Sequence, residues 1–163
     1  MNYAVILAGG KGLRLGGDIP KQLLPLAGKH VIRWSAETFH SVSEINRIIV
    51  VAEKNSISTI KKILPAAEFP KIITFIEGGA ERSDSSYNAL VSRVFKADDI
   101  ILFHDAARPF VTTEIIKAVI KEVKTSGAAG VYIPAVDTVT VAENNTVSYI
   151  PERMNVFYAQ TPQ

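Results

Sequence analysis

Residues 3–21 read "YAVILAGGKGLRLGGDIPK", in which a short apolar run passes directly into a stretch crowded with glycine, lysine and arginine. Short apolar runs are typical of strands buried in a parallel sheet, and ligands of such sheets bind beyond the carboxyl ends of the strands. Glycines let backbone N–H groups approach an anion closely, and Lys and Arg side chains add full positive charges. Residues 8–21 therefore predict an anion-binding loop after the first strand.

Several interpretations of this loop compete. No window of the chain matches the Walker A pattern G-x-x-x-x-G-K-[ST], which excludes a P-loop NTPase. The glycines at 10–16 are one residue off the dinucleotide fingerprint, but "GDIP" at 17–20 interrupts the helix which that motif requires. A basic loop that wraps the phosphates of a nucleoside triphosphate uses all the charges, and we favour it over a nicotinamide-dependent enzyme and over a solvated turn.

The rest of the chain alternates between apolar runs and amphipathic stretches. The runs predict strands at 3–7, 47–52, 72–76, 100–103 and 130–133, and helical spacing predicts helices at 31–41, 56–64, 82–95 and 113–124. In the helix at 82–95, the apolar positions are Tyr87, Leu90, Val91 and Val94. This alternation predicts an α/β fold of Rossmann-like type, with a mostly parallel sheet and helices on both of its faces.

The end of the chain breaks this alternation. Residues 137–151, "DTVTVAENNTVSYIP", predict two strands around a turn at 143–146, which makes 137–150 a protruding β-ribbon arm within a single domain of residues 1–163. Valines alternate with polar residues along the arm, so we expect one face of it to be buried. An isolated two-stranded ribbon is marginally stable without a partner. Because the pattern stops midway at Gln163, we expect a C-terminally truncated chain.

Composition excludes several classes of protein. With 47% hydrophobic and 21% charged residues, the 163-residue chain has the composition of a globular domain. The net charge of +2 argues against a surface that coats nucleic acid, and no apolar run reaches the ~18 residues of a membrane span. Since the chain contains no cysteine and starts directly with a strand-like run, we expect a cytoplasmic protein without disulfides or thiolate metal sites.

Five stretches together carry a resemblance to a known family. The segment "AGGKGLRLG…PKQ" at 8–22 resembles the signature of nucleotidyltransferases that join a sugar phosphate to a nucleoside triphosphate. The other four are "GGAERSDSSYNAL" at 78–90, "HDAARPF" at 104–110, "PAVDTV" at 134–139 and "AQTPQ" at 159–163. In order and spacing they are similar to the 2-C-methyl-D-erythritol 4-phosphate cytidylyltransferases of isoprenoid synthesis.

The resemblance implies a fold, an activity and partners. It implies the nucleotide-diphospho-sugar transferase fold, CTP and a polyol phosphate as substrates, and Mg²⁺ as cofactor. It also implies a homodimer in which the arm crosses to the second subunit. Ribitol-5-phosphate cytidylyltransferases share much of the pattern, and "IPERMNVFYAQTPQ" at 150–163 leans toward them. The acceptor therefore stays open, as does a nucleotide-binding module without turnover.

The resemblance also implies roles for individual residues. The expected roles are catalytic cations at Arg14 and Lys21; nucleotide contacts at Ala8, Gly9, Gly10, Gly79 and Ser85; acceptor contacts at Arg108, Thr138 and Arg153; and a magnesium ligand at Asp105. These residue types suit the chemistry, because Arg and Lys stay charged beside phosphates and Mg²⁺ prefers carboxylate, phosphate and water oxygens. The competing interpretations are solubilising charge for the cations, a helix start for Ser85 and a turn cap for Asp105.

Three further positions qualify the resemblance. Ala80 stands where some members of the family have an aspartate, which weakens the expectation of one base contact. Thr140 stands where the family often has a lysine, which weakens the expectation for half of the acceptor site. His104 has no second histidine at ligand spacing, and an ionised phosphate nucleophile needs no general base, so we expect a structural role for it.

Overall fold

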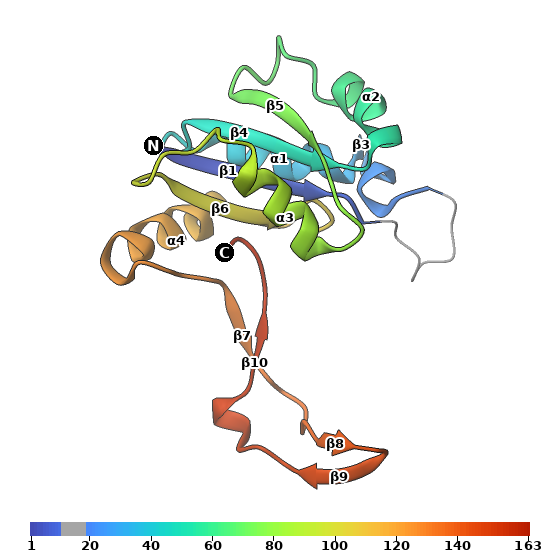
Figure 1. The fold of residues 1–163 in the computed structure, drawn as a ribbon, viewed down its shortest axis with the longest axis vertical. Helices are drawn as coiled ribbons and strands as arrows, with labels where there is room; N and C mark the ends of the chain where they lie inside the picture. The colour runs from blue at the N-terminus through green and yellow to red at the C-terminus, as the bar shows by residue number, and fades with distance from the viewer. Residues whose placement is uncertain (11–18) are drawn as a thin grey trace.

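Four of the predicted strands form one parallel sheet in the computed structural model, which describes residues 1–10 and 19–163 (Figure 1). The order across the sheet is β5 (Ile72–Glu77), β4 (Arg47–Ala52), β1 (Asn2–Ala8) and β6 (Ile100–Asp105). Neighbouring strands are parallel throughout, so all four end at the same edge. In the register, Ala8 pairs with Ala52, Ala52 with Glu77, and Leu7 with Asp105.

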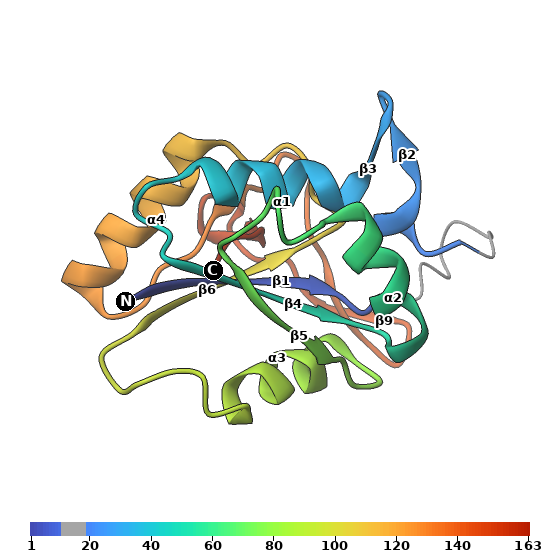
Figure 2. The same ribbon diagram turned by 90° about the horizontal axis from the view of Figure 1, so that it is seen from above.

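Helices cover both faces of this sheet (Figure 2). They are α1 (Val31–Ser41), α2 (Lys54–Ile63), α3 (Arg82–Val91) and α4 (Thr113–Ser126). Alternate residues of β1 divide the core: Ala4, Ile6 and Ala8 join the cluster under α1, α2 and α4, whereas Tyr3, Val5 and Leu7 join the cluster under α3. The predicted fold class, a parallel α/β sheet with helices on both faces, is confirmed. No helix in the described part of the chain is both long and apolar enough to cross a membrane.

The prediction of a fifth parallel strand at 130–133 is wrong. Strand β7 (Tyr132–Pro134) lies outside the main sheet and pairs antiparallel with β10 (Phe157–Ala159). The backbone of Gln163 occupies the outer edge of β6 instead, where it exchanges hydrogen bonds of 2.7 and 2.9 Å with Phe103. An apolar run indicates that a segment prefers the strand conformation. Pairing with residues far away in the sequence, such as that of Gln163 with Phe103, decides which strands the main sheet contains.

The predicted helix at 82–95 is shorter than expected, and its apolar face is not buried. Helix α3 ends at Val91, and Arg93 has a φ of +59°. Tyr87 is 63% exposed, while the residues that pack α3 onto the sheet are Ser85 and Ala89. Tyr87 stands two positions from each of them, about 200° around the helix axis, so its side chain points away from the sheet.

The arm that projects from the body is longer than the predicted 137–150, because it also includes β7 and β10 and so comprises residues 132–159 (Figure 1). Its neck is the β7–β10 pair, and its ribbon is β8 (Val141–Glu143) paired with β9 (Thr146–Tyr149). Asn144 and Asn145 have φ values of +49° and +63°, as a two-residue type I′ hairpin turn requires. The predicted ribbon and turn are confirmed. The part of the chain that the structure describes does not bury the expected face of the ribbon, since Val147 is 60% exposed.

Short elements complete the chain. They are η2 (Lys21–Leu23), β2 (Pro25–Leu26), β3 (Lys29–His30) and η3 (Arg153–Asn155).

His104 lies in β6 with no exposed surface, and the structure gives both of its ring nitrogens a partner. Nε2 is 3.1 Å from the carbonyl oxygen of Arg108, which accepts hydrogen bonds and cannot donate them, so Nε2 carries the proton. Nδ1 then accepts from the Thr161 hydroxyl at 3.1 Å. Burial lowers the pKa of His104 to about 4, against the opposing effects of the Arg108 carbonyl and the Asp105 charge. The neutral ring has the structural role predicted for it.

Acid is expected to destabilise the protein through this histidine. His104 takes up a proton below pH ~6.5 in the unfolded chain but only near pH 4 in the folded chain. The stability that the neutral histidine contributes is therefore fully present above pH ~6.5 and is lost as the pH falls toward 4. Between pH 7.5 and 4.5 the free energy of unfolding should fall by about 2 to 3 kcal/mol more in the wild type than in His104→Gln, which does not titrate. Urea unfolding at both pH values measures this difference, and parallel losses in the two proteins would contradict it.

Candidate functional site

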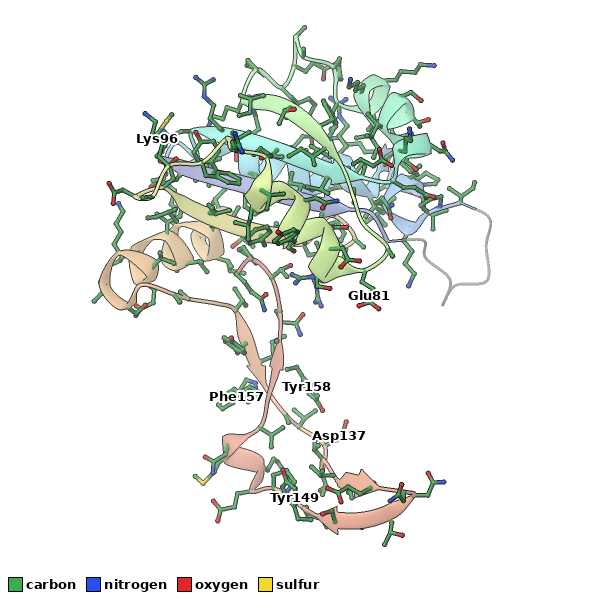
Figure 3. The ribbon with its side chains drawn as sticks, in the orientation of Figure 1. Glu81, Lys96, Asp137, Tyr149, Phe157 and Tyr158 are labelled. Atoms are coloured by element: carbon green, nitrogen blue, oxygen red, sulfur yellow. The ribbon has the colours of Figure 1, made fainter. Side chains whose placement is uncertain are left out.

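The three loops that carry most of the predicted site residues follow β1, β5 and β6, and the structure brings them together at the carboxyl edge of the sheet. A Cβ atom built on Gly9 would lie 3.2 Å from Oγ of Ser85, so the loop after β1 touches the start of α3. Nε of Arg82 donates to Oδ1 of Asp105 at 2.9 Å, which joins the start of α3 to the end of β6. Figure 3 shows Glu81 at this end of α3.

The loop before α3 is tightly built. The Ser85 hydroxyl, 3% exposed, accepts from the backbone N–H of Gly79 and donates to the carbonyl of Glu81, each at 3.1 Å. Glu81 and Asp84 cap the helix reciprocally, and the N–H of Glu81 donates to Oδ2 of Asp84 at 3.0 Å. A Cβ on Gly79 would lie 2.1 Å from Cβ of Asp84, so glycine is required there. The prediction that Gly79 and Ser85 contact the nucleotide stays a prediction.

Gln22 binds the backbone of residues 8–10, at the end of β1. Its side chain is 3% exposed, and Nε2 donates to the carbonyls of Ala8 at 2.6 Å and Gly10 at 3.2 Å. Lys21 stands next to it at the start of η2, so the backbone of that cation is tied to the loop after β1. Sequence reasoning assigned no role to Gln22; its signal was an amide in the otherwise apolar run that follows Lys21.

Asp105 binds two arginines. Oδ1 accepts from Nε of Arg82 at 2.9 Å, and Oδ2 accepts from Nε of Arg108 at 3.2 Å. Two guanidinium groups and one carboxylate leave the cluster with one net positive charge, and all three side chains are partly exposed. Such a cluster suits an anionic ligand, because guanidinium groups form strong, directional hydrogen bonds to phosphate oxygens.

The same bonds bear on the magnesium prediction. Both oxygens of Asp105 already accept from guanidinium groups, and two arginines repel a divalent cation. Among the residues that the structure describes, no group of three His, Asp or Glu side chains is placed to hold a metal ion. In this arrangement Asp105 does not fit the role of magnesium ligand, and its metal role is untested.

The remaining predicted residues lie in different places. Arg14 is outside the described residues. Arg108 belongs to the body, whereas Thr138 and Arg153 belong to the arm, where both are exposed (Figure 1). The predicted acceptor contacts of one chain are therefore divided between its body and its arm.

A surface cavity of about 420 Å³ lies elsewhere, beside β5 and the end of α2. Its lining includes Lys61, Leu64, Ile72 and Phe75 and contains none of the predicted site residues. The loops at the carboxyl edge, rather than this cavity, hold the residues with the relevant chemistry.

Gly79→Ala tests the close contact before α3. The added methyl group would overlap Cβ of Asp84, so the first turn of α3 must shift, and we expect a loss of more than about 2 kcal/mol of stability together with weaker CTP binding. Gly10→Ala is the control for stability, because a Cβ there meets no atom of the described residues within 4 Å. Thermal unfolding and calorimetric titration of CTP measure both effects. Equal melting temperatures for the two variants would refute the contact.

Known proteins are similar to this chain along nearly its whole length. A bifunctional ribulose 5-phosphate reductase/CDP-ribitol pyrophosphorylase of Haemophilus influenzae is 38% identical over 165 residues, which are 99% of this chain and 35% of that protein. The 2-C-methyl-D-erythritol 4-phosphate cytidylyltransferase of Clostridium perfringens is 41% identical over 162 residues, or 98% of this chain and 71% of that protein. This chain thus spans about a third of the first relative and about 70% of the second.

Solved structures agree with these similarities. The crystal structure of 4-diphosphocytidyl-2C-methyl-D-erythritol synthase from Anaerococcus prevotii superposes with a TM-score of 0.82 at 27% identity and covers 99% of this chain and 68% of its own. The Francisella tularensis 2-C-methyl-D-erythritol 4-phosphate cytidylyltransferase gives 0.76 at 32% identity, with 99% and 70% covered. These likenesses confirm the nucleotide-diphospho-sugar transferase fold expected from the sequence. Since the sequence pattern of the family also matches residues 2–163, the chain belongs to the 2-C-methyl-D-erythritol 4-phosphate cytidylyltransferase family.

Proposed function

We propose that this protein transfers CMP from CTP to 2-C-methyl-D-erythritol 4-phosphate and releases pyrophosphate, as a step in the synthesis of isoprenoid precursors. The observation that carries the proposal is the meeting of three loops at one sheet edge in a member of this family. A cytoplasmic location and a requirement for Mg²⁺ belong to the same proposal and rest on the sequence. The proposed roles of the side chains do not depend on where the ion binds.

In the proposed reaction, an oxygen of the acceptor phosphate attacks the α-phosphorus of CTP. The bond from that phosphorus to the bridging oxygen breaks, and pyrophosphate leaves with the electron pair. Because both reactants are anions, the protein has to position them and stabilise the growing negative charge, and no covalent intermediate is needed. Arg14 and Lys21 supply this charge in the proposal. The position of Lys21 next to Gln22, whose amide binds the carbonyls of Ala8 and Gly10, supports this role.

The nucleotide is proposed to lie against the backbone of residues 8–10 and against the loop at 79–85. Support comes from the tight packing of both loops, since Ser85 lies within contact distance of Gly9 and bonds to Gly79. Backbone groups held in this way need no reorganisation when the ligand arrives. The acceptor phosphate is proposed to bind Arg108, whose guanidinium belongs to the positively charged cluster around Asp105.

Thr138 and Arg153 are proposed to bind the acceptor phosphate of a second subunit. The arm carries large apolar side chains that are 41% to 78% exposed in the single chain, and Figure 3 shows Tyr149, Phe157 and Tyr158 along it. Exposed apolar surface of this extent marks a protein–protein contact, and a second copy of this chain is the partner that the family resemblance implies. A homodimer would place the two arm residues at the site of the neighbouring body.

A second acceptor has specific support. The 38% identity to a protein named for CDP-ribitol synthesis makes ribitol 5-phosphate the alternative substrate. A nucleotide-binding module without turnover is the remaining alternative, and only an assay separates it from an enzyme.

A paired assay tests the proposed function. The protein is incubated with CTP, Mg²⁺ and either 2-C-methyl-D-erythritol 4-phosphate or ribitol 5-phosphate, and pyrophosphate release is measured. We expect faster release with the first acceptor. Arg14→Ala and Lys21→Ala should each lower the rate by about 10²-fold or more, since each removes a charge from the triphosphate site. Lys96→Ala, an exposed lysine at the opposite end of the sheet (Figure 3), is the matched control. Wild-type rates of pyrophosphate release by Lys21→Ala would overturn the catalytic role of Lys21. If the wild type released no pyrophosphate with either acceptor, the module that binds CTP without turnover would be the better interpretation.

Two tyrosines with similar exposure test the dimer. Tyr149 in the ribbon is 57% exposed and Tyr87 on α3 is 63% exposed. If the arm forms the subunit contact, Tyr149→Asp should shift the protein from dimer to monomer by burying an unpaired charge, and Tyr87→Asp should not. Light scattering after size-exclusion chromatography measures the mass. A wild-type monomer, or a dimer that tolerates Tyr149→Asp, would contradict the proposal.

A further inference from the structure

The segment that returns from the arm to the body, residues 160–161, binds the residue proposed to hold the acceptor phosphate. Oε1 of Gln160 accepts a short hydrogen bond from Nη1 of Arg108. The backbone N–H of Gln160 donates to the carbonyl of Val131 at 2.8 Å, so the two legs of the arm are joined just where Gln160 meets the arginine. Asp105 accepts from Nε of the same guanidinium, and the two bonds together fix the direction of its plane.

Thr161 reaches the backbone of Arg108 through a buried polar chain. Its hydroxyl donates to Nδ1 of His104, and Nε2–H of His104 donates to the carbonyl of Arg108. The same hydroxyl oxygen accepts from the N–H of Asp105 at 3.3 Å. Thr161 is 9% exposed and His104 has no exposed surface, so water competes little for these bonds. The hydroxyl therefore links the return segment to both ends of the turn that carries Arg108.

We propose that Gln160 and Thr161 are positioning residues for Arg108: one orients its guanidinium directly, and the other fixes its backbone through His104. The inference rests on the proposed function, because it takes Arg108 as the acceptor-phosphate contact. In a dimer, each arm then serves two sites. The return segment at the base of the arm, residues 160–161, positions Arg108 of its own subunit. The arm itself supplies Thr138 and Arg153 to the other subunit.

The test measures acceptor binding, which does not require turnover. Titration calorimetry gives the Kd of 2-C-methyl-D-erythritol 4-phosphate in the presence of Mg²⁺ and α,β-methylene-CTP. Thr161→Val removes the hydroxyl at nearly constant shape, and Gln160→Met removes the amide at nearly constant length. Each should raise this Kd about three- to tenfold, the value of one hydrogen bond. The Kd of the nucleotide analogue should stay within about twofold of the wild type.

Matched variants separate positioning from general loss of structure. Thr161→Ser keeps the hydroxyl and should restore acceptor binding, and Thr125→Val makes the same change as Thr161→Val at an exposed position on α4 and should have no effect. If Thr161→Val does not fold, Gln160→Met decides alone, because that side chain is partly exposed.

Arg108→Gln distinguishes the inference from the proposed function. If Arg108→Gln weakens acceptor binding while Thr161→Val and Gln160→Met leave the Kd unchanged, the positioning role is overturned and the acceptor role of Arg108 stands. If Arg108→Gln leaves the Kd unchanged, the acceptor role is wrong and the positioning role falls with it.

Discussion

The parallel pairing of β1 with both β4 and β6 is the constraint on which the rest of this structure depends. Because the three strands run in one direction, the chain leaves each of them at the same edge, whatever the length of the crossover between them. Residues 9, 79–85 and 105–108 meet there although they are far apart in sequence. Burial of β1 on both faces holds this edge in place, since its alternate side chains belong to two different core clusters.

The electrostatics of the edge follow from which charges are paired. Asp105 binds both Arg82 and Arg108 and so restrains their flexible side chains. Its negative charge cancels one of the two positive charges, and the remaining one is available to attract an anion. Lys21 precedes Gln22, whose side-chain amide binds the backbone of Ala8 and Gly10. Cations and backbone groups arranged in this way suit an anionic ligand. The Asp105 carboxylate bridges Arg82 and Arg108, and its predicted role as a magnesium ligand stays a prediction.

The sequence predicted those features that local pattern determines. Apolar runs located the four strands of the sheet, and the two strand-like runs of 137–151 located the hairpin turn between them. In that turn Asn144 and Asn145 have left-handed backbone, which asparagine tolerates. The residues at 130–133 show the limit: their pattern is that of a buried strand, and a pairing between Phe103 and Gln163 excludes them from the sheet. Likewise, helical spacing could not tell that α3 packs through Ser85 and Ala89. Gln22, Gln160 and Thr161 act on backbone groups or side chains elsewhere in the chain, and no periodicity signals such contacts.

The pairing of Gln163 with β6 also bears on self-association. A strand at the edge of a sheet presents unpaired N–H and C=O groups, which another chain can use as a template for aggregation. At Phe103 the protein's own backbone occupies those groups. The opposite edge is β5, where the ammonium of Lys61 lies 5.3 Å from the ring of Phe75 and places a charge beside the strand. The backbone of Gln163 beside one edge strand and the charge of Lys61 beside the other both discourage edge-to-edge pairing of molecules into fibres.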